Sequence, residues 1–191
     1  MDYTYSTRLK RIFAIGVVLT LAWMIVMGLS VKPLNSKQIV SFELAKTPEA
    51  ASKIIKEWEE KDLIVKVKKS IYLDFGFLFL YSSSIALGCL VISAFTQNHF
   101  LIQTGSVVSL IVPFAGLFDV IENLAMLKTL SGEVTMLPVA ITFWFASIKF
   151  FIVVVSLVFV ISCLIFGVVK KIVGNKIVRN KQIISFLNVM F

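Results

Sequence analysis

Four long apolar segments constrain this chain more than any other feature of its sequence. They cover residues 12–31, 71–95, 101–127 and 137–169. A helix needs about 20 predominantly apolar residues to cross the hydrocarbon core of a bilayer, because each residue advances it by about 1.5 Å. Backbone N–H and C=O groups find no water in that core, so such segments fold as helices. The sequence therefore predicts an all-α fold, a four-helix transmembrane bundle.

The composition agrees with a membrane protein and excludes other classes. Hydrophobic residues make up 58% of the 191 residues and charged residues only 16%, which is more apolar and less charged than a soluble domain. This balance excludes a soluble enzyme, a disordered tail and a disulfide-stapled secreted domain. We expect a single integral membrane domain over residues 1–191.

The first loop, residues 32–70, is the only sizeable polar region and contains a helix with clear start signals. Thr47 is placed to cap the helix, Pro48 to occupy its first position and Glu49 its first turn. The apolar residues that follow fall on one face: Ala50, Ala51, Ile54, Ile55 and Trp58. The pattern predicts an extramembrane amphipathic helix that lies on the bilayer or on the end of the bundle. It can be a cap packed against the other helices or a gate over a buried site.

The remaining connections set the order of the spans. The short polar turn 96–99 makes the second and third spans antiparallel neighbours. The fourth segment, 137–169, is about 50 Å long as a helix and must tilt or project from the membrane. The basic C-terminal tail, residues 170–191, alternates cations with apolar residues, a pattern typical of a segment resting on an anionic leaflet.

The distribution of cations bears on orientation. Four spans place both termini on one side of the membrane, and a positive-inside count is close to balanced between the two sides. Arg8, Lys10 and Arg11 flank the entry of the first span, whereas the cations of the long loop are mixed with acids. We therefore expect a multi-pass protein of a cell membrane, the bacterial plasma (inner) membrane, with cytoplasmic termini.

Four ionisable residues lie inside the predicted spans: Asp74, Asp119, Glu122 and Lys149. Each costs roughly 2.5 to 3.5 kcal/mol at the centre of a membrane helix, so an unpaired charge facing lipid is implausible. Because neighbouring spans are antiparallel, all four residues lie toward the same side of the membrane, beneath the long first loop. The sequence therefore predicts that they meet in one leaflet, whichever way the chain is oriented.

The residues around these charges extend the predicted cluster. Asn123 follows Asp119 by four positions and shares its helical face with Glu122, while Tyr81 follows Asp74 by two helical turns. Several carboxyl groups would compete for the ammonium of Lys149, so at least one would hold a proton at neutral pH. We interpret Asp74, Tyr81, Asp119, Glu122, Asn123 and Lys149 as an intramembrane polar cluster that binds a ligand.

Three functions remain open for such a cluster. It can bind a lipid-like or amphipathic small molecule, or it can tie helices together in a structural or accessory subunit, which could oligomerise. It can also serve a small proton-coupled transporter, although no charged residue continues toward the other leaflet. The small-residue patterns Ser84-x-x-x-Gly88 and Gly105-x-x-x-Ser109 are weak evidence for a helix interface.

Other kinds of chemistry find little support in the sequence. A single histidine, His99, and two cysteines, Cys89 and Cys163, are too few for the usual metal, haem or iron–sulfur sites, so we expect no metal and no cofactor. Both cysteines are read as free thiols. The net charge of +8 points to membrane lipids as partners and not to nucleic acid. Catalytic residues stay unknown and enzymatic activity stays open, because no nucleophile motif is present.

Several short motifs, taken in their order along the chain, resemble those of a known family. They are Phe42-Glu43-Leu44-Ala45, Thr47-Pro48-Glu49, Trp58, Leu73-Asp74-Phe75, Tyr81, Phe118-Asp119-x-x-Glu122-Asn123 and Lys149. They look like those of a family of small uncharacterised bacterial four-helix membrane proteins, with an Asp-x-x-Glu-Asn element in the third span and a lysine in the fourth. The resemblance covers residues 10–170 and brings no assigned activity. It implies that Glu43 contributes to the polar site from the first loop.

Overall fold

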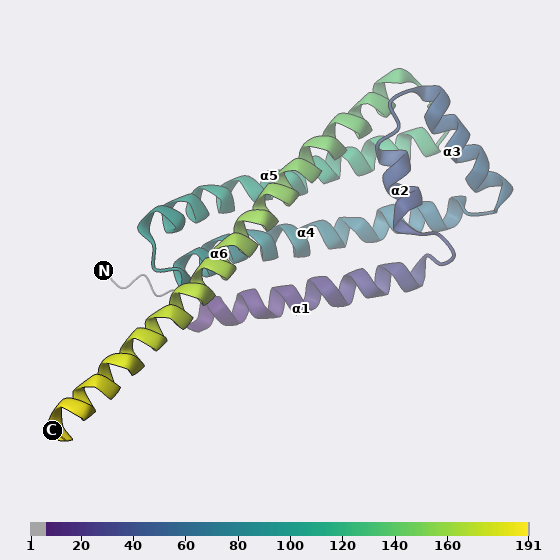
Figure 1. The fold of residues 1–191 in the computed structure, drawn as a ribbon. Coiled ribbons are helices and arrows are strands. Elements are labelled where there is room, and N and C mark those ends of the chain that lie inside the picture. Colours follow the sequence, from purple (N-terminus) through teal and green to yellow (C-terminus); the bar gives the residue numbers. More distant parts are fainter. Residues whose placement is uncertain (1–6, 191) are drawn as a thin grey trace.

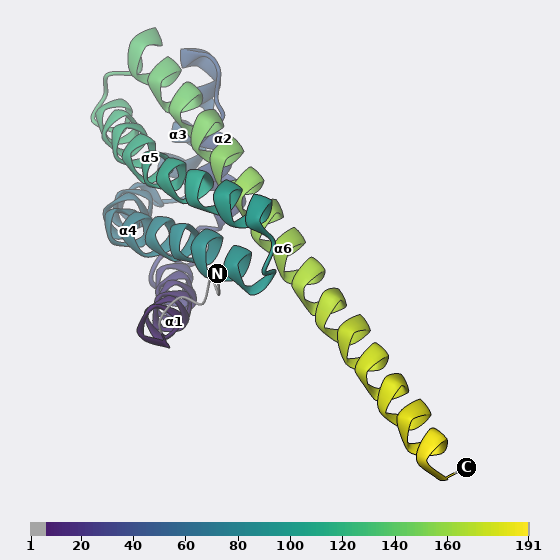
Figure 2. The same ribbon diagram turned by 90° about the vertical axis from the view of Figure 1, so that its left-hand side faces the viewer.

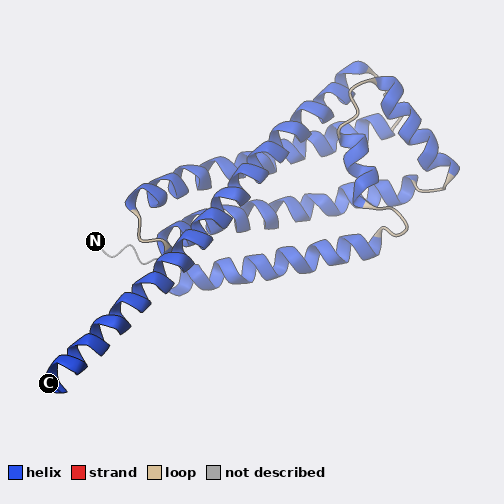
Figure 3. Ribbon diagram, in the orientation of Figure 1, coloured by secondary structure: helices blue, strands red, loops and turns tan. Residues whose placement is uncertain are grey.

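The computed structural model describes residues 7–190, with side chains up to Val173. The regular elements in this part of the chain are all helices (Figure 3). Four are long and apolar enough to cross a membrane: α1 (Thr7–Ser30), α4 (Ile64–Phe95), α5 (His99–Leu130) and α6 (Met136–Met190). The predicted all-α fold with four candidate spans is confirmed, and it is the architecture of a multi-pass membrane protein.

The helices α4, α5 and α6 form the centre of the bundle, and α1 lies along the outer side of α4 (Figures 1 and 2). The start of α1 and the turn between α4 and α5 lie at one end of the bundle (Figure 1). The long first loop covers the opposite end, as the order of four spans predicts. We call these the turn end and the loop end.

The attachment of α1 to α4 combines apolar packing with a few polar contacts. The indole Nε1 of Trp23 donates a hydrogen bond to the carbonyl of Leu73, at 3.1 Å. One turn earlier, the hydroxyls of Thr20 and Ser84 lie 3.0 Å apart. Gly76 makes room for the Trp23 ring, since a Cβ at this position would lie 2.6 Å from Cζ2 of the indole. The side chains of α1 otherwise remain accessible, which suits a helix that is apolar on all sides in lipid.

Two helices of the first loop pack over the loop end of the bundle. They are α2 (Ser36–Glu43) and α3 (Pro48–Glu60), and the side chain of Thr47 caps α3 with Pro48 at its first position, as predicted. Phe42 and Trp58 pack edge to face, with ring centroids 5.1 Å apart. Both rings join an apolar core that includes Met126 and Val139 from the ends of α5 and α6. The predicted amphipathic helix is therefore a cap on the bundle end.

The sequence prediction missed α2, whereas the helix that continues into the second span begins at Ile64, close to its expected start near Asp62. The eight residues of α2 are too few to show a clear apolar period, but Asn35 and Gln38 form a reciprocal capping box at its start. Residues 64–70 belong to the polar first loop by composition, because Lys66, Lys68 and Lys69 interrupt the apolar run, but they form the first turns of α4. Hydropathy detects the membrane-compatible part of a helix, whereas lysine is a good helix former and the helix begins earlier.

The helix of the fourth span does not stop at residue 169. Its backbone continues to Met190 and projects away from the bundle (Figure 1, yellow). The predicted tail is therefore a continuation of α6, because neither Lys170 nor Lys171 breaks a helix. The ammonium of Lys170 donates to the carbonyl of Thr96 at 2.9 Å, just after the end of α4. This contact places a cation where the carbonyl groups of α4 are left without helical partners.

Candidate functional site

The centre of the polar cluster is Lys149, a buried residue of α6. Its Nζ lies 2.6 Å from Oδ1 of Asp119 and 2.8 Å from Oε2 of Glu122. Both acids come from α5, where a spacing of three residues puts them on the face turned toward α6. One ammonium group thus links α5 to α6 through two buried carboxylates.

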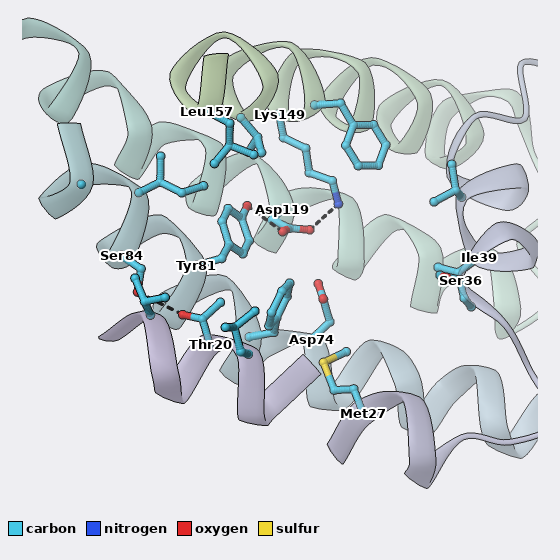
Figure 4. A pocket seen from close by; sticks show the side chains of 18 of the residues that line it. Thr20, Met27, Ser36, Ile39, Asp74, Tyr81, Ser84, Asp119, Lys149 and Leu157 are labelled. Carbon is cyan, nitrogen blue, oxygen red and sulfur yellow. Dashed lines mark hydrogen bonds and ion pairs between the residues drawn. The ribbon is translucent and has the colours of Figure 1, made fainter. Parts of the chain in front are cut away.

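Further hydrogen bonds connect α4 to the same cluster. The hydroxyl of Tyr81 donates to Oδ2 of Asp119 at 2.9 Å, so this carboxylate accepts from both neighbouring helices (Figure 4). The Nδ2 of Asn123 donates to Oδ2 of Asp74 at 2.8 Å. The predicted meeting of the intramembrane charges near the loop end is confirmed, together with the positions of Tyr81 and Asn123.

A fourth carboxyl group reaches the cluster from outside the spans. Glu43 is the last residue of α2 and only 8% of its surface is exposed. Its Oε2 is buried without a hydrogen-bond partner. Burial raises the pKa of Glu43, an effect that the positive charge of Lys149 and a side-chain contact with Glu122 oppose and that the negative charge of Asp119 reinforces. The contribution of Glu43 that the family resemblance implied is thus matched by its position.

The charges of the cluster do not balance. Glu43, Asp74, Asp119 and Glu122 share the single ammonium of Lys149 among the described residues, so full ionisation would leave three uncompensated negative charges. Buried charges without partners are strongly unfavourable. The cluster must therefore hold protons, or take up positive charge from a molecule that binds there.

A cavity of about 610 Å³ adjoins the cluster. Its polar wall is formed by Glu43, Asp74, Tyr81, Asp119 and Lys149. Away from the loop end, apolar side chains of three helices line it: Phe13, Val17 and Leu21 from α1, Ile85 from α4, and Val153, Leu157 and Val160 from α6. The cavity is thus charged at one end and mostly apolar along the rest, with α1 and α6 as opposite walls.

Figure 4 shows how the polar side chains of the cavity are oriented. The carboxylate of Asp74 and the ammonium of Lys149 point from opposite sides into the same space, with Tyr81 beside Asp119. Glu122 is fully buried and does not line this space, although it pairs with Lys149. Of the predicted ligand-binding residues, Asp74, Tyr81, Asp119 and Lys149 can therefore touch a molecule in the cavity, while Glu122 acts through Lys149 and Asn123 through Asp74.

The sequence prediction missed part of the cavity lining. Ser36 and Ile39 line it from α2, which was not foreseen, and Thr20 and Ser84 contribute hydroxyls from α1 and α4. The capping box at Asn35 is the only signal that could have located α2. No local pattern identifies the apolar wall, because it forms where α1 and α6, far apart in sequence, face the same space.

Other reactive side chains lie outside this site. Cys89 and Cys163 are buried free thiols, as predicted. Within the described part of the chain, no group of three or more histidine, cysteine or acidic residues is arranged to hold a metal ion. At the cluster itself, the position between Asp119 and Glu122 is taken by the ammonium of Lys149.

No protein-family model, no curated protein and no solved structure matches this chain. The resemblance to small bacterial four-helix membrane proteins therefore stays a prediction. The function has to be argued from the geometry of the cavity and its polar wall.

Proposed function

We propose that this protein binds an amphipathic, lipid-like small molecule, with the polar head group at the cluster around Lys149 and the apolar part between α1 and α6. The observation that carries the proposal is the division of one cavity into a charged end and an apolar remainder. A volume of about 610 Å³ lies within the range of small-molecule sites, roughly 300 to 1,000 Å³.

The shape of the lining supports a ligand with a chain. Along α4, lining residues extend from Ser70 to Gly88, a distance of about 27 Å at 1.5 Å per residue. This approaches the thickness of the hydrocarbon core, about 30 Å. A molecule lying along α4 would keep its head group near the loop end and its chain at the depth of lipid tails. In the proposed setting, the plasma membrane of a bacterium, membrane lipids supply such molecules.

The cluster also fits a structural role, which is the second candidate function. Lys149 ties α6 to α5, and Tyr81 ties α4 to Asp119. An accessory subunit would need no more than this. Against it stand the cavity beside the cluster, which such a tie does not need, and the Oε2 of Glu43, which is buried without a hydrogen bond.

The small-residue patterns do not favour a partner helix. Gly105 lies against Ser93 and the carbonyl of Cys89, and Gly88 lies against Phe13 and Val160. These glycines are used for packing within the chain. The transporter alternative gains no support either, since the hydroxyls of Ser106 and Ser109 donate to carbonyls of their own helix.

A filled cavity tests the proposal. Val153 lines the apolar part, whereas the neighbouring Val154 is 57% exposed on the outer surface of α6 and is not part of the lining. We expect Val153→Phe to lose most of the small molecule that co-purifies with the wild-type protein in mild detergent, as measured by mass spectrometry of the extract. Val154→Phe adds the same ring and should retain it. Equal retention by both variants, or no bound molecule in the wild type, would contradict the proposal.

A further inference from the structure

The polar end of the cavity offers two carboxyl groups that have no cation of their own. The ammonium of Lys149 is held by Asp119 and Glu122 at 2.6 and 2.8 Å. Among the described residues, neither Glu43 nor Asp74 forms an ion pair, although both line the cavity. Their charges act on each other. A molecule in the cavity therefore contacts two carboxyl groups that lack an ion pair, and an ammonium that is already paired twice.

Glu43 is the stronger indication of a missing partner. It is more than nine-tenths buried, and its Oε2 faces the site without a hydrogen-bond donor. Buried polar atoms are nearly always paired, because removing them from water without a partner costs about 1–3 kcal/mol. Asp74 receives one bond, from Asn123, which occupies only part of its accepting capacity. The site is thus built for a ligand that donates.

We propose that the head group bound here is a protonated amine, held between the carboxylates of Glu43 and Asp74. This inference rests on the proposed function and names the chemical class of its ligand. An ammonium group supplies both the donors that Glu43 lacks and the positive charge that the cluster lacks. A head group whose only charge is a phosphate or sulfate would instead add negative charge to a site where carboxyl groups already outnumber the one ammonium.

The aromatic residues of the lining fit the same head group. Phe77 and Tyr81 pack with centroids 5.4 Å apart beside Asp74, and Phe150 lies under the ammonium of Lys149 at 5.1 Å from its centroid. The faces of aromatic rings attract cations when the surroundings are poor in water. A second ammonium would therefore find a compatible wall as well as its counter-charges.

The test compares three probes with the same twelve-carbon chain: dodecylamine, dodecanol and dodecyl sulfate. Binding to the purified full-length protein in a maltoside detergent is measured by native mass spectrometry and calorimetry at pH 7.5. We expect dodecylamine to bind at least about tenfold more tightly than dodecanol, since charge-assisted bonds are stronger than neutral ones, and dodecyl sulfate to bind most weakly. Glu43→Gln should abolish the preference for the amine. Glu59→Gln, an exposed glutamate of α3 that does not line the cavity, should keep it.

The outcomes separate this inference from the proposed function. If dodecanol binds as tightly as dodecylamine and Val153→Phe removes both, the cavity binds amphiphiles but the amine head group is wrong. If no probe binds in a way that Val153→Phe removes, the proposed function itself fails. Should Glu43→Gln not fold, Asp74→Asn gives the same comparison. Displacement of dodecylamine by phosphatidylethanolamine, but not by phosphatidylcholine, would support the inference and identify a membrane lipid as the source of the amine. If dodecylamine is preferred but neither lipid displaces it, the inference is supported and the natural ligand is a soluble amphiphilic amine.

Discussion

Lys149 and Asp119 lie 2.6 Å apart on facing helices, and both side chains are almost completely shielded from solvent. Because the carboxylate of Asp119 also accepts from Tyr81, this one pair connects α4, α5 and α6 at the same depth. The pair forms one wall of the cavity, so the residues that hold the bundle together are also those that set the charge of the site.

Removal of the central cation should destabilise the bundle. We expect Lys149→Met to lower stability in detergent by roughly 3–5 kcal/mol at pH 8, because buried carboxylates lose their partner. The loss should be smaller at pH 5, where the carboxyl groups take up protons more readily. Adding Glu122→Gln should restore part of the stability at pH 8. Thermal unfolding of the single and double variants measures each effect.

Lys128→Met provides the matched control for that substitution. Lys128 pairs with Glu133 at 3.0 Å, but both side chains are more than half exposed. Exposed ion pairs contribute about 0–1 kcal/mol, so this variant should unfold close to the wild type. Equal losses from both lysine substitutions would show that the buried network has no special role.

The stability of the protein should depend on pH through Glu43. Burial raises the pKa of Glu43 above its ordinary value of 4.5, while Lys149, Asp119, Glu122 and Asp74 act on it from the other helices. Its protonated form is favoured in the folded state, so its contribution is complete below that ordinary value and is lost as pH rises through the raised one.

Glu43→Gln isolates this effect, because the amide resembles the protonated acid. We expect the variant to gain stability relative to the wild type as pH increases from 4.5, by at most about 1.4 kcal/mol per pH unit. Unfolding measured across pH should therefore give a flatter curve for Glu43→Gln, whereas Glu59→Gln should follow the wild type. Parallel curves for all three proteins would disprove the assigned role.

The packing of α3 on α2 should control the site from a distance. Trp58 is 1% exposed and packs against Phe42, the neighbour of Glu43 in sequence. We expect Trp58→Ala to cost about 3–5 kcal/mol and to weaken binding of the dodecylamine probe, because α2 loses the support that positions Glu43. Trp144→Ala removes an equally large ring that is 62% exposed on α6, and should change binding little.

The close contact between α4 and α5 depends on a glycine, Gly105, which has no side chain. A Cβ at Gly105 would lie 2.5 Å from the carbonyl oxygen of Cys89, too close for the helices to keep their spacing. Gly105→Ala should therefore destabilise the bundle by about 1–3 kcal/mol. Gly28→Ala in α1 meets nothing within 4 Å and should be tolerated. Thermal unfolding of the two alanine variants in the same detergent decides between these outcomes.

Much of the architecture could be predicted because it depends on local composition. The length of an apolar run determines whether it can cross a bilayer, and the order of Thr47, Pro48 and Glu49 determines where α3 begins. The meeting of Asp74, Asp119 and Lys149 also followed from the sequence, since antiparallel spans fix the depth of each residue. The helix of the second span reaches beyond the apolar run to Ile64, because lysines that end a hydrophobic run do not end a helix.

The sequence by itself determined the four candidate spans, the end of the bundle at which the charges gather and the excess of carboxyl groups over ammonium groups. Only the tertiary structure decided that α2 carries Glu43 into the cluster, that Glu122 is buried outside the cavity lining, and that α1 and α6 face one cavity. The physical reason is that depth in a membrane depends on position along one helix. Burial and cavity shape depend instead on side chains brought together from helices distant in the chain.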